Sequence, residues 1–213
     1  MREVAPGLWD WQAAHPEWQE GSAWGPEVSA HALLVGDGVV LFDPIDVPAE
    51  LRARATAVVL TAPWHERDTR ELGLPVYAPR PESAQDLIDL YDVDPARLEG
   101  FVSSDLRWLV HEGGGEWHEV SADEPPPFGI EAYAGRTPQD LVYYVESARA
   151  VISGDTLSDF GEGLEIRSEW LSAKVTREEV AARLRPLLER DVEVVLPAHG
   201  APTGRAALER ALD

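Results

Sequence analysis

The chain has 213 residues, enough for one domain with a sizeable core, and its formal net charge at pH 7 is −21. A charge of this sign repels phosphate backbones, so we expect no nucleic-acid partner. The sequence contains no cysteine, which excludes disulfides and thiolate metal ligands, so any metal would have to be held by His, Asp or Glu.

Nothing in the sequence suggests a membrane or a secretory route. No stretch approaches the roughly 18 uninterrupted apolar residues that a membrane span needs. The segment from Met1 to Gly7 lacks the basic head and the apolar stretch of a secretory signal. We therefore expect a soluble, cytoplasmic protein. Because no Ser/Gly-rich linker or short-period repeat interrupts the chain, residues 1–213 are expected to form a single domain.

The first third of the chain predicts a β-hairpin followed by a helix and a strand. Two apolar runs, Val28 to Val35 and Val39 to Phe42, flank Gly36-Asp37-Gly38, whose glycines allow the positive φ angles of a tight turn. A short helix within residues 48–55 would lead to a strand at residues 57–60. Its continuous apolar character is typical of a strand buried on both faces.

Two helix starts carry a recognisable capping pattern. Ser83 with Asp86, and Thr176 with Glu179, can each satisfy the free backbone amides of a first helical turn. Pro186 should kink or break the second of these helices. The other expected elements are strands at residues 75–78, 130–133, 141–146, 150–153 and 192–196, and a closing helix at residues 204–212.

Four short motifs mark the ends of expected strands or the loops that follow them. They are Val58-Val59-Leu60-Thr61, His65-Glu66-Arg67-Asp68, Gly154-Asp155-Thr156-Leu157 and Leu196-Pro197-Ala198-His199-Gly200. In this order they resemble the metallo-β-lactamase superfamily, and the resemblance covers nearly the whole chain. It implies a four-layer αββα sandwich, α+β or α/β in class, and hydrolysis of an ester, thioester, amide or phosphoester bond.

The metal-binding loop of that superfamily, His-x-His-x-Asp-His after a strand ending in Thr, can be aligned in two registers. Aligned directly from Thr61, the four ligand positions hold Ala62, Trp64, Glu66 and Arg67. With one residue inserted, they hold Pro63, His65, Arg67 and Asp68. The second register is preferred because it keeps two metal donors, an imidazole and a carboxylate, whereas the first keeps one carboxylate.

A further ligand position of the superfamily carries an arginine in this chain. Arg136 lies in Ala134-Gly135-Arg136-Thr137-Pro138, which resembles the superfamily's Gly-His-Thr-Pro turn with the histidine replaced. A guanidinium group stays protonated and has no lone pair to give, so it cannot bind zinc. Arg67 brings a second cation to a donor position in the preferred register. The motifs therefore identify the fold without certifying the reaction.

The remaining matches leave donors for at most one ion. Asp155 matches the superfamily's bridging aspartate, and His199 matches its final histidine. Together with Asp68 and His65, they are candidate ligands for one weakly held divalent metal, either zinc, manganese or iron. Such an ion would lower the pKa of its bound water and supply hydroxide near neutral pH.

The alternative is a protein without cofactor that binds a ligand or serves as a scaffold. Without metal, the Asp155 and Asp68 carboxylates would be left uncompensated, which is costly when they are buried. Arg67 and Arg136 could offset them by bidentate pairing. In either interpretation Arg136, Arg67 and Trp64 are candidate substrate-binding residues, and the two arginines favour a small anionic ligand.

Overall fold

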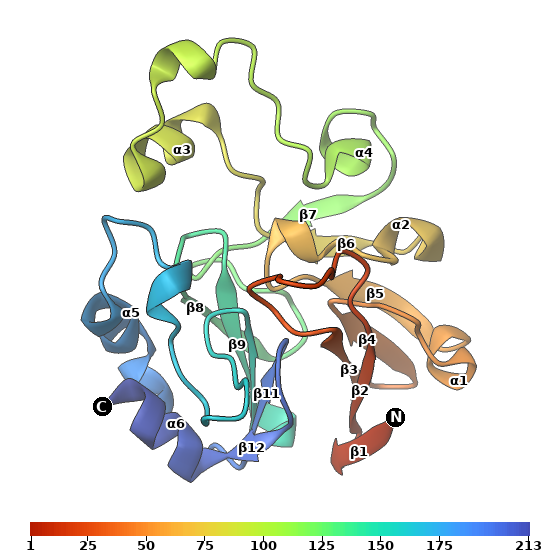
Figure 1. The fold of residues 1–213 in the computed structure, drawn as a ribbon. Helices are drawn as coiled ribbons and strands as arrows, with labels where there is room; N and C mark the ends of the chain where they lie inside the picture. The colour runs from red at the N-terminus through yellow and green to blue at the C-terminus, as the bar shows by residue number, and fades with distance from the viewer.

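A computed structural model describes all 213 residues, and it consists of two β-sheets packed face to face with helices on the outside (Figure 1). The N-terminal half supplies the first sheet and the C-terminal half supplies the second. None of the helices combines the length and the apolar character required to cross a bilayer.

The first sheet has seven strands in the order β1-β2-β3-β4-β5-β6-β7. β4 to β7 run parallel to one another, whereas β1 to β4 are antiparallel. The strands are β1 (Arg2–Ala5), β2 (Leu8–Ala14), β3 (Glu27–Val35), β4 (Gly38–Phe42), β5 (Ala55–Val59), β6 (Val76–Ala78) and β7 (Trp117–Glu119).

The second sheet has five strands in the order β12-β11-β10-β9-β8, with β10 and β11 parallel. The strands are β8 (Ile130–Ala134), β9 (Leu141–Val145), β10 (Ala150–Gly154), β11 (Val194–Pro197) and β12 (Thr203–Gly204). Parallel neighbours end at the same edge of a sheet, so the loops after β4, β5, β10 and β11 gather at one end of the sandwich.

The helices lie outside the two sheets (Figure 1). They are α1 (Ala49–Arg52), α2 (Thr69–Leu72), α3 (Ala84–Tyr91), α4 (Arg107–Val110), α5 (Arg177–Leu184) and α6 (Arg205–Leu212). The middle hydrophobic cluster, between the sheets, contains Phe42, Tyr143 and Ile152, all fully buried. A separate cluster under α5 and α6 includes Leu184 and Leu208. The four-layer αββα sandwich expected from the resemblance is confirmed.

Most of the expected elements are present, with two informative differences. The hairpin and both capping boxes are confirmed, and α5 ends at Leu184, where a 3-10 turn containing Pro186 takes over. The sequence did not predict β1 and β2, although β2 pairs along its whole length with β3. Trp9, Trp11 and Ala13 alternate onto the outer face of the sheet, where the Trp11 indole donates a hydrogen bond to the Ile45 carbonyl at 2.8 Å. The pattern is obscured by Asp10, a buried polar residue that lies between them in the sequence.

The segment between β6 and β7 rises above the sandwich and carries α3 and α4 (Figure 1). No clear element was predicted for residues 93–110. The structure has only a 3-10 turn and α4 there. This segment lies over the edge where the loops after the parallel strands meet, so it supplies one wall of the site.

Candidate functional site

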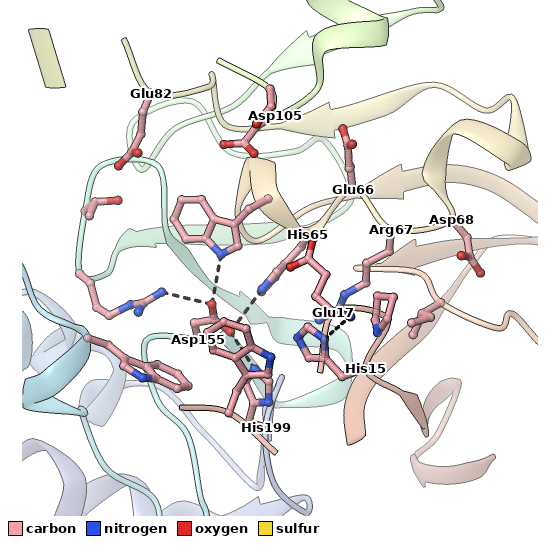
Figure 2. Close-up of a pocket in the computed structure, with 18 of the residues that line it drawn as sticks. His15, Glu17, His65, Glu66, Arg67, Asp68, Glu82, Asp105, Asp155 and His199 are labelled. Carbon is pink, nitrogen blue, oxygen red and sulfur yellow. Dashed lines mark hydrogen bonds and ion pairs between the residues drawn. The ribbon is translucent and has the colours of Figure 1, made fainter. Parts of the chain in front are cut away.

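Side chains from distant parts of the chain converge at the strand ends. Asp43 directly follows β4, His65 ends the 3-10 turn after β5, and Asp155 directly follows β10. His199 follows β11, and Arg136 lies in the loop between β8 and β9. Figure 2 shows His65 and His199 on either side of Asp155. The structure therefore brings together four of the residues singled out from the sequence.

The imidazole of His65 is held by a buried carboxylate. Its Nδ1 lies 3.1 Å from Asp43 Oδ2 and 2.9 Å from Thr61 Oγ1, which leaves Nε2 facing Asp155 Oδ1 at 3.2 Å. Burial lowers the pKa of His65, but the charges of Asp155 and Asp43 outweigh burial and raise it to about 9. His65 is therefore an imidazolium cation at neutral pH.

Asp155 is surrounded by donors. Its Oδ2 accepts hydrogen bonds from Trp64 Nε1 at 3.1 Å and from Arg136 Nη2 at 3.3 Å. Burial would raise the pKa of Asp155, but the charges of His65 and Arg136 hold it well below its usual range. The carboxylate is thus ionised, and one of its two oxygens is fully used by the protein.

Arg136 joins Asp155 to a second, fully buried carboxylate. Its Nε donates to Asp140 Oδ2 at 2.6 Å, and Thr156 Oγ1 donates to the same oxygen at 2.8 Å. Burial raises the pKa of Asp140, and the Arg136 charge opposes this effect. The guanidinium carbon also lies 6.0 Å from the ring centre of Trp64 and 5.4 Å from that of Trp170, within the range of cation–π attraction.

Arg67 points inward and is bound by main-chain oxygens. Its Nη1 donates to the carbonyls of Ser29 at 2.9 Å and of Asp43 at 2.8 Å. The residue has a φ of 37°, a left-handed conformation that costs energy for a side chain of this size. Burial lowers the pKa of Arg67, while the charges of Asp43 and Asp155 oppose this. These interactions fix the arginine inside the protein.

His199 stays neutral beside this network. Its Nε2 lies 3.5 Å from Asp155 Oδ1, and its ring stacks between those of His15 and Phe160. Burial outweighs the attraction of Asp155 and lowers the pKa of His199 to about 4. Its Nδ1 has no hydrogen-bond partner.

The charges of the network balance without a metal. Three carboxylates and three cations form a group that we call the ion-pair centre: Asp43, Asp140 and Asp155 with His65, Arg67 and Arg136. Their formal charges cancel at pH 7, because the pKa of His65 is raised to about 9. A buried group of this kind is stable only when every charge has a partner.

The two sheets meet closely at the centre, and this explains the glycine of the Gly-Asp motif. Gly154 has a φ of 52°, and a Cβ at this position would lie 2.7 Å from Thr61 Oγ1. The Leu141 amide donates to the Thr61 carbonyl at 2.7 Å, which ties the sheets together there. Only glycine allows this approach, which places Asp155 opposite His65.

Asp68, the remaining candidate ligand, is used differently. Its Oδ2 accepts a hydrogen bond from the Asp46 amide at 2.7 Å, and Figure 2 shows it away from Asp155. Its charge still acts on Arg67. Trp64, by contrast, lies directly at the centre through its bond to Asp155.

Sequence reasoning missed both of the buried carboxylates that balance the cations. Asp43 directly follows the expected strand Val39 to Phe42, and its place beside the Thr61 strand end is a usable signal. Asp140 lies four residues after Arg136, in a loop, where an ion pair has no periodic signature. Also missed were the cavity-lining residues His15, Glu17, Glu82, Asp105 and Trp170.

A cavity of about 900 Å³ opens above the ion-pair centre. Arg136 lines this cavity, as do Asp155 and His65, which contribute to its floor (Figure 2). The volume is within the range of small-molecule sites.

The donors do not fit the two-metal centre that the resemblance implies. Arg136 lies where the resemblance implies an imidazole, and Arg136 and Trp64 both donate hydrogen bonds to Asp155 Oδ2. No group of three or more His, Asp or Glu side chains is placed to hold an ion. The nearest approach is Asp155 Oδ1 with the Nε2 atoms of His65 and His199, at 3.2 and 3.5 Å.

The two-sheet architecture is that of the metallo-β-lactamase fold. No family model and no curated protein matches the sequence. Solved structures do match. The structure of TMB-1 has a TM-score of 0.65 at 14% identity, covering 99% of this chain and 94% of that one.

Two further structures agree. A metallo-β-lactamase from Erythrobacter litoralis has a TM-score of 0.60 at 14% identity, covering 100% of this chain and 89% of that one. TTHA1623 in a di-iron-bound form has a TM-score of 0.56 at 24% identity, covering 88% of this chain and 95% of that one. These likenesses establish the fold.

Proposed function

We propose that this protein is a metal-free binding protein in which the ion-pair centre stands in place of the metal site of the fold. The charge balance of the centre is the observation that carries the proposal. A divalent cation bound at His65 would displace the proton of its imidazolium, so the centre, neutral before binding, would gain about one uncompensated positive charge, at a cost of several kcal/mol. Arg67 and Arg136 would repel such an ion.

The contacts of Asp155 support this proposal. Asp155 Oδ2 accepts a hydrogen bond from Arg136, and His65 Nε2 forms an ion pair with Asp155 Oδ1 that lacks hydrogen-bond geometry. Cations on both sides of a carboxylate offset its charge, as a metal ion does elsewhere. Because both arginines are engaged by internal acceptors, we assign them to the protein's own stability. A small anionic ligand held by them is the competing proposal, and it would require breaking these bonds.

A second candidate function is hydrolysis at one weakly held metal ion. It is favoured by the separations of 3.2 and 3.5 Å between Asp155 Oδ1 and the two imidazole Nε2 atoms. Ligands of one tetrahedral zinc lie about 3.3 Å apart. The Asp43 carboxylate behind His65 has the placement of an outer-shell group that orients a ligand. A bound ion would supply a hydroxide nucleophile near neutral pH.

Elemental analysis of the purified protein distinguishes the two functions. We expect substoichiometric metal in the protein as isolated and after incubation with zinc followed by dialysis. Arg136→His is the matched variant, because it restores an imidazole at the third position and should gain zinc. One equivalent of zinc on the unaltered protein, lost in His199→Ala, would establish the hydrolase candidate instead.

A further inference from the structure

The cavity above the ion-pair centre has an acidic side without counterions. Glu17, Glu82 and Asp105 line it, and none of them forms an ion pair in the structure. We call these three residues the acidic rim. Figure 2 shows Glu82 and Asp105 on the side of the cavity opposite His199. The rim therefore faces the open volume without an ion-pair partner, although the charges of Arg136 and His65 still act to lower the pKa values of Glu82 and Asp105, respectively.

The ionisation of the rim reflects this lack of partners. Burial raises the pKa of Glu82, and the nearby charge of Asp105 raises it further. Burial also raises the pKa of Asp105, with a contribution from Glu17. These shifts are opposite in direction to that of Asp155, whose neighbours are cations. A cation placed in the cavity would relieve the repulsion among the rim carboxylates.

The walls of the same cavity are aromatic. Trp24, Trp64, Tyr91 and Trp170 all line it. A guanidinium group already lies over two of these rings, Trp64 and Trp170, which shows that the walls can accept a cation. Aromatic faces combined with carboxylates are the usual means by which proteins hold ammonium groups that carry apolar substituents.

We propose that this cavity binds a small organic cation, an ammonium group with an apolar body, between the aromatic walls and the acidic rim. The inference rests on the proposed metal-free function and specifies its ligand class. The two cavity arginines do not reverse the sign of the site, because their charges are matched within the ion-pair centre. An anion would face the unpaired carboxylates of the rim.

Calorimetric titration with choline, its uncharged isostere 3,3-dimethylbutan-1-ol, and benzoate tests the proposal. Choline and the isostere have nearly the same shape, so the difference between them reports the charge. We expect choline to bind and the isostere to bind more weakly by about tenfold or more. Equal affinity for the two, preferential binding of benzoate, or no binding of choline would each overturn the ligand class.

A pair of double variants tests whether the acidic rim is responsible for the binding of choline. The double variant Glu82→Gln, Asp105→Asn should lower choline affinity about tenfold while keeping side-chain size. Glu99→Gln, Asp123→Asn removes the same charge from exposed positions outside the cavity and should leave affinity unchanged. Equal losses in both doubles would mean that only net charge matters, against the proposal. Zinc content, measured on the same samples, reports separately on the metal-free function.

Discussion

The ion-pair centre and the acidic rim each contain three carboxylates, yet the surroundings of these carboxylates differ. In the ion-pair centre each carboxylate has a cation within contact, and the pKa values of Asp43 and Asp155 are lowered, whereas burial raises that of Asp140 against the charge of Arg136. In the acidic rim no cation is paired, and the pKa values of Glu82 and Asp105 are raised. The presence or absence of a neighbouring cation therefore distinguishes the carboxylates that stabilise the fold from those that are available to a ligand.

Removing Arg136 should disrupt the ion-pair centre and have the largest effect on stability. Arg136→Ala leaves Asp140 without a cation and weakens the compensation of Asp155, so we expect a loss of about 3–5 kcal/mol in the free energy of unfolding. Urea denaturation monitored by tryptophan fluorescence measures it.

Two matched variants test whether the loss of stability arises from the buried ion-pair centre. Arg136→Lys keeps the charge but not the fork of donors to Asp140 and Asp155, so its loss should be intermediate. Arg149 pairs with Asp191 and Glu193 at the surface, and Arg149→Ala should change stability little. Similar stability of the Arg136→Ala protein and the unaltered one would contradict the ion-pair centre.

The pH dependence of stability should reveal the charge on His65. Its pKa is about 9 in the folded protein and 6.5 ordinarily, so its contribution is complete below about pH 6.5 and is lost as the pH rises through 9. The full effect is on the order of 3 kcal/mol. Denaturation midpoints between pH 6.5 and 10 should fall in the unaltered protein.

The control for this titration is His65→Gln, which is less stable at pH 7 and should show a flatter curve above it. The effect of His199 on the pH dependence of stability has the opposite sign, because the pKa of His199 is lowered to about 4. Its contribution is present above pH 6.5 and is lost as the pH falls toward 4. A flat stability profile from pH 6.5 to 10 would show that His65 is neutral and that the charges of the floor do not cancel as described.

Motifs predicted the fold because they mark strand ends that the topology must bring together. The Thr61, Asp155 and His199 positions follow strands β5, β10 and β11, and parallel strands end at one edge. The partners of these residues could not be read in the same way. Asp140 pairs with Arg136 through an irregular loop, and only the three-dimensional arrangement shows that the arginine's charge is already used.

The acidic rim was beyond sequence reasoning for a related reason. Glu17 follows β2, whereas Glu82 and Asp105 belong to the segment that carries α3 and α4, and no spacing relates them. Residues 93–110 gave no periodic signal from which that segment could be placed over the site. A long irregular connection is positioned by its contacts, such as that of the Leu106 amide with Glu66 at 2.8 Å.

Neutralising carboxylates of the acidic rim should have the smallest effect on stability. The sign of this effect should be opposite to that of removing a charge from the ion-pair centre. A carboxylate whose pKa is raised on folding opposes folding at neutral pH, so Glu82→Gln and Asp105→Asn should each stabilise the protein by at most about 1 kcal/mol. In Glu82→Gln the new amide oxygen can still accept the hydrogen bond that Tyr91 donates to Glu82 at 3.4 Å, so the change isolates charge. Asp155→Asn, by the same urea titration, should destabilise. If the rim variants also destabilised, the rim would be part of the structural network rather than a surface held ready for a cation.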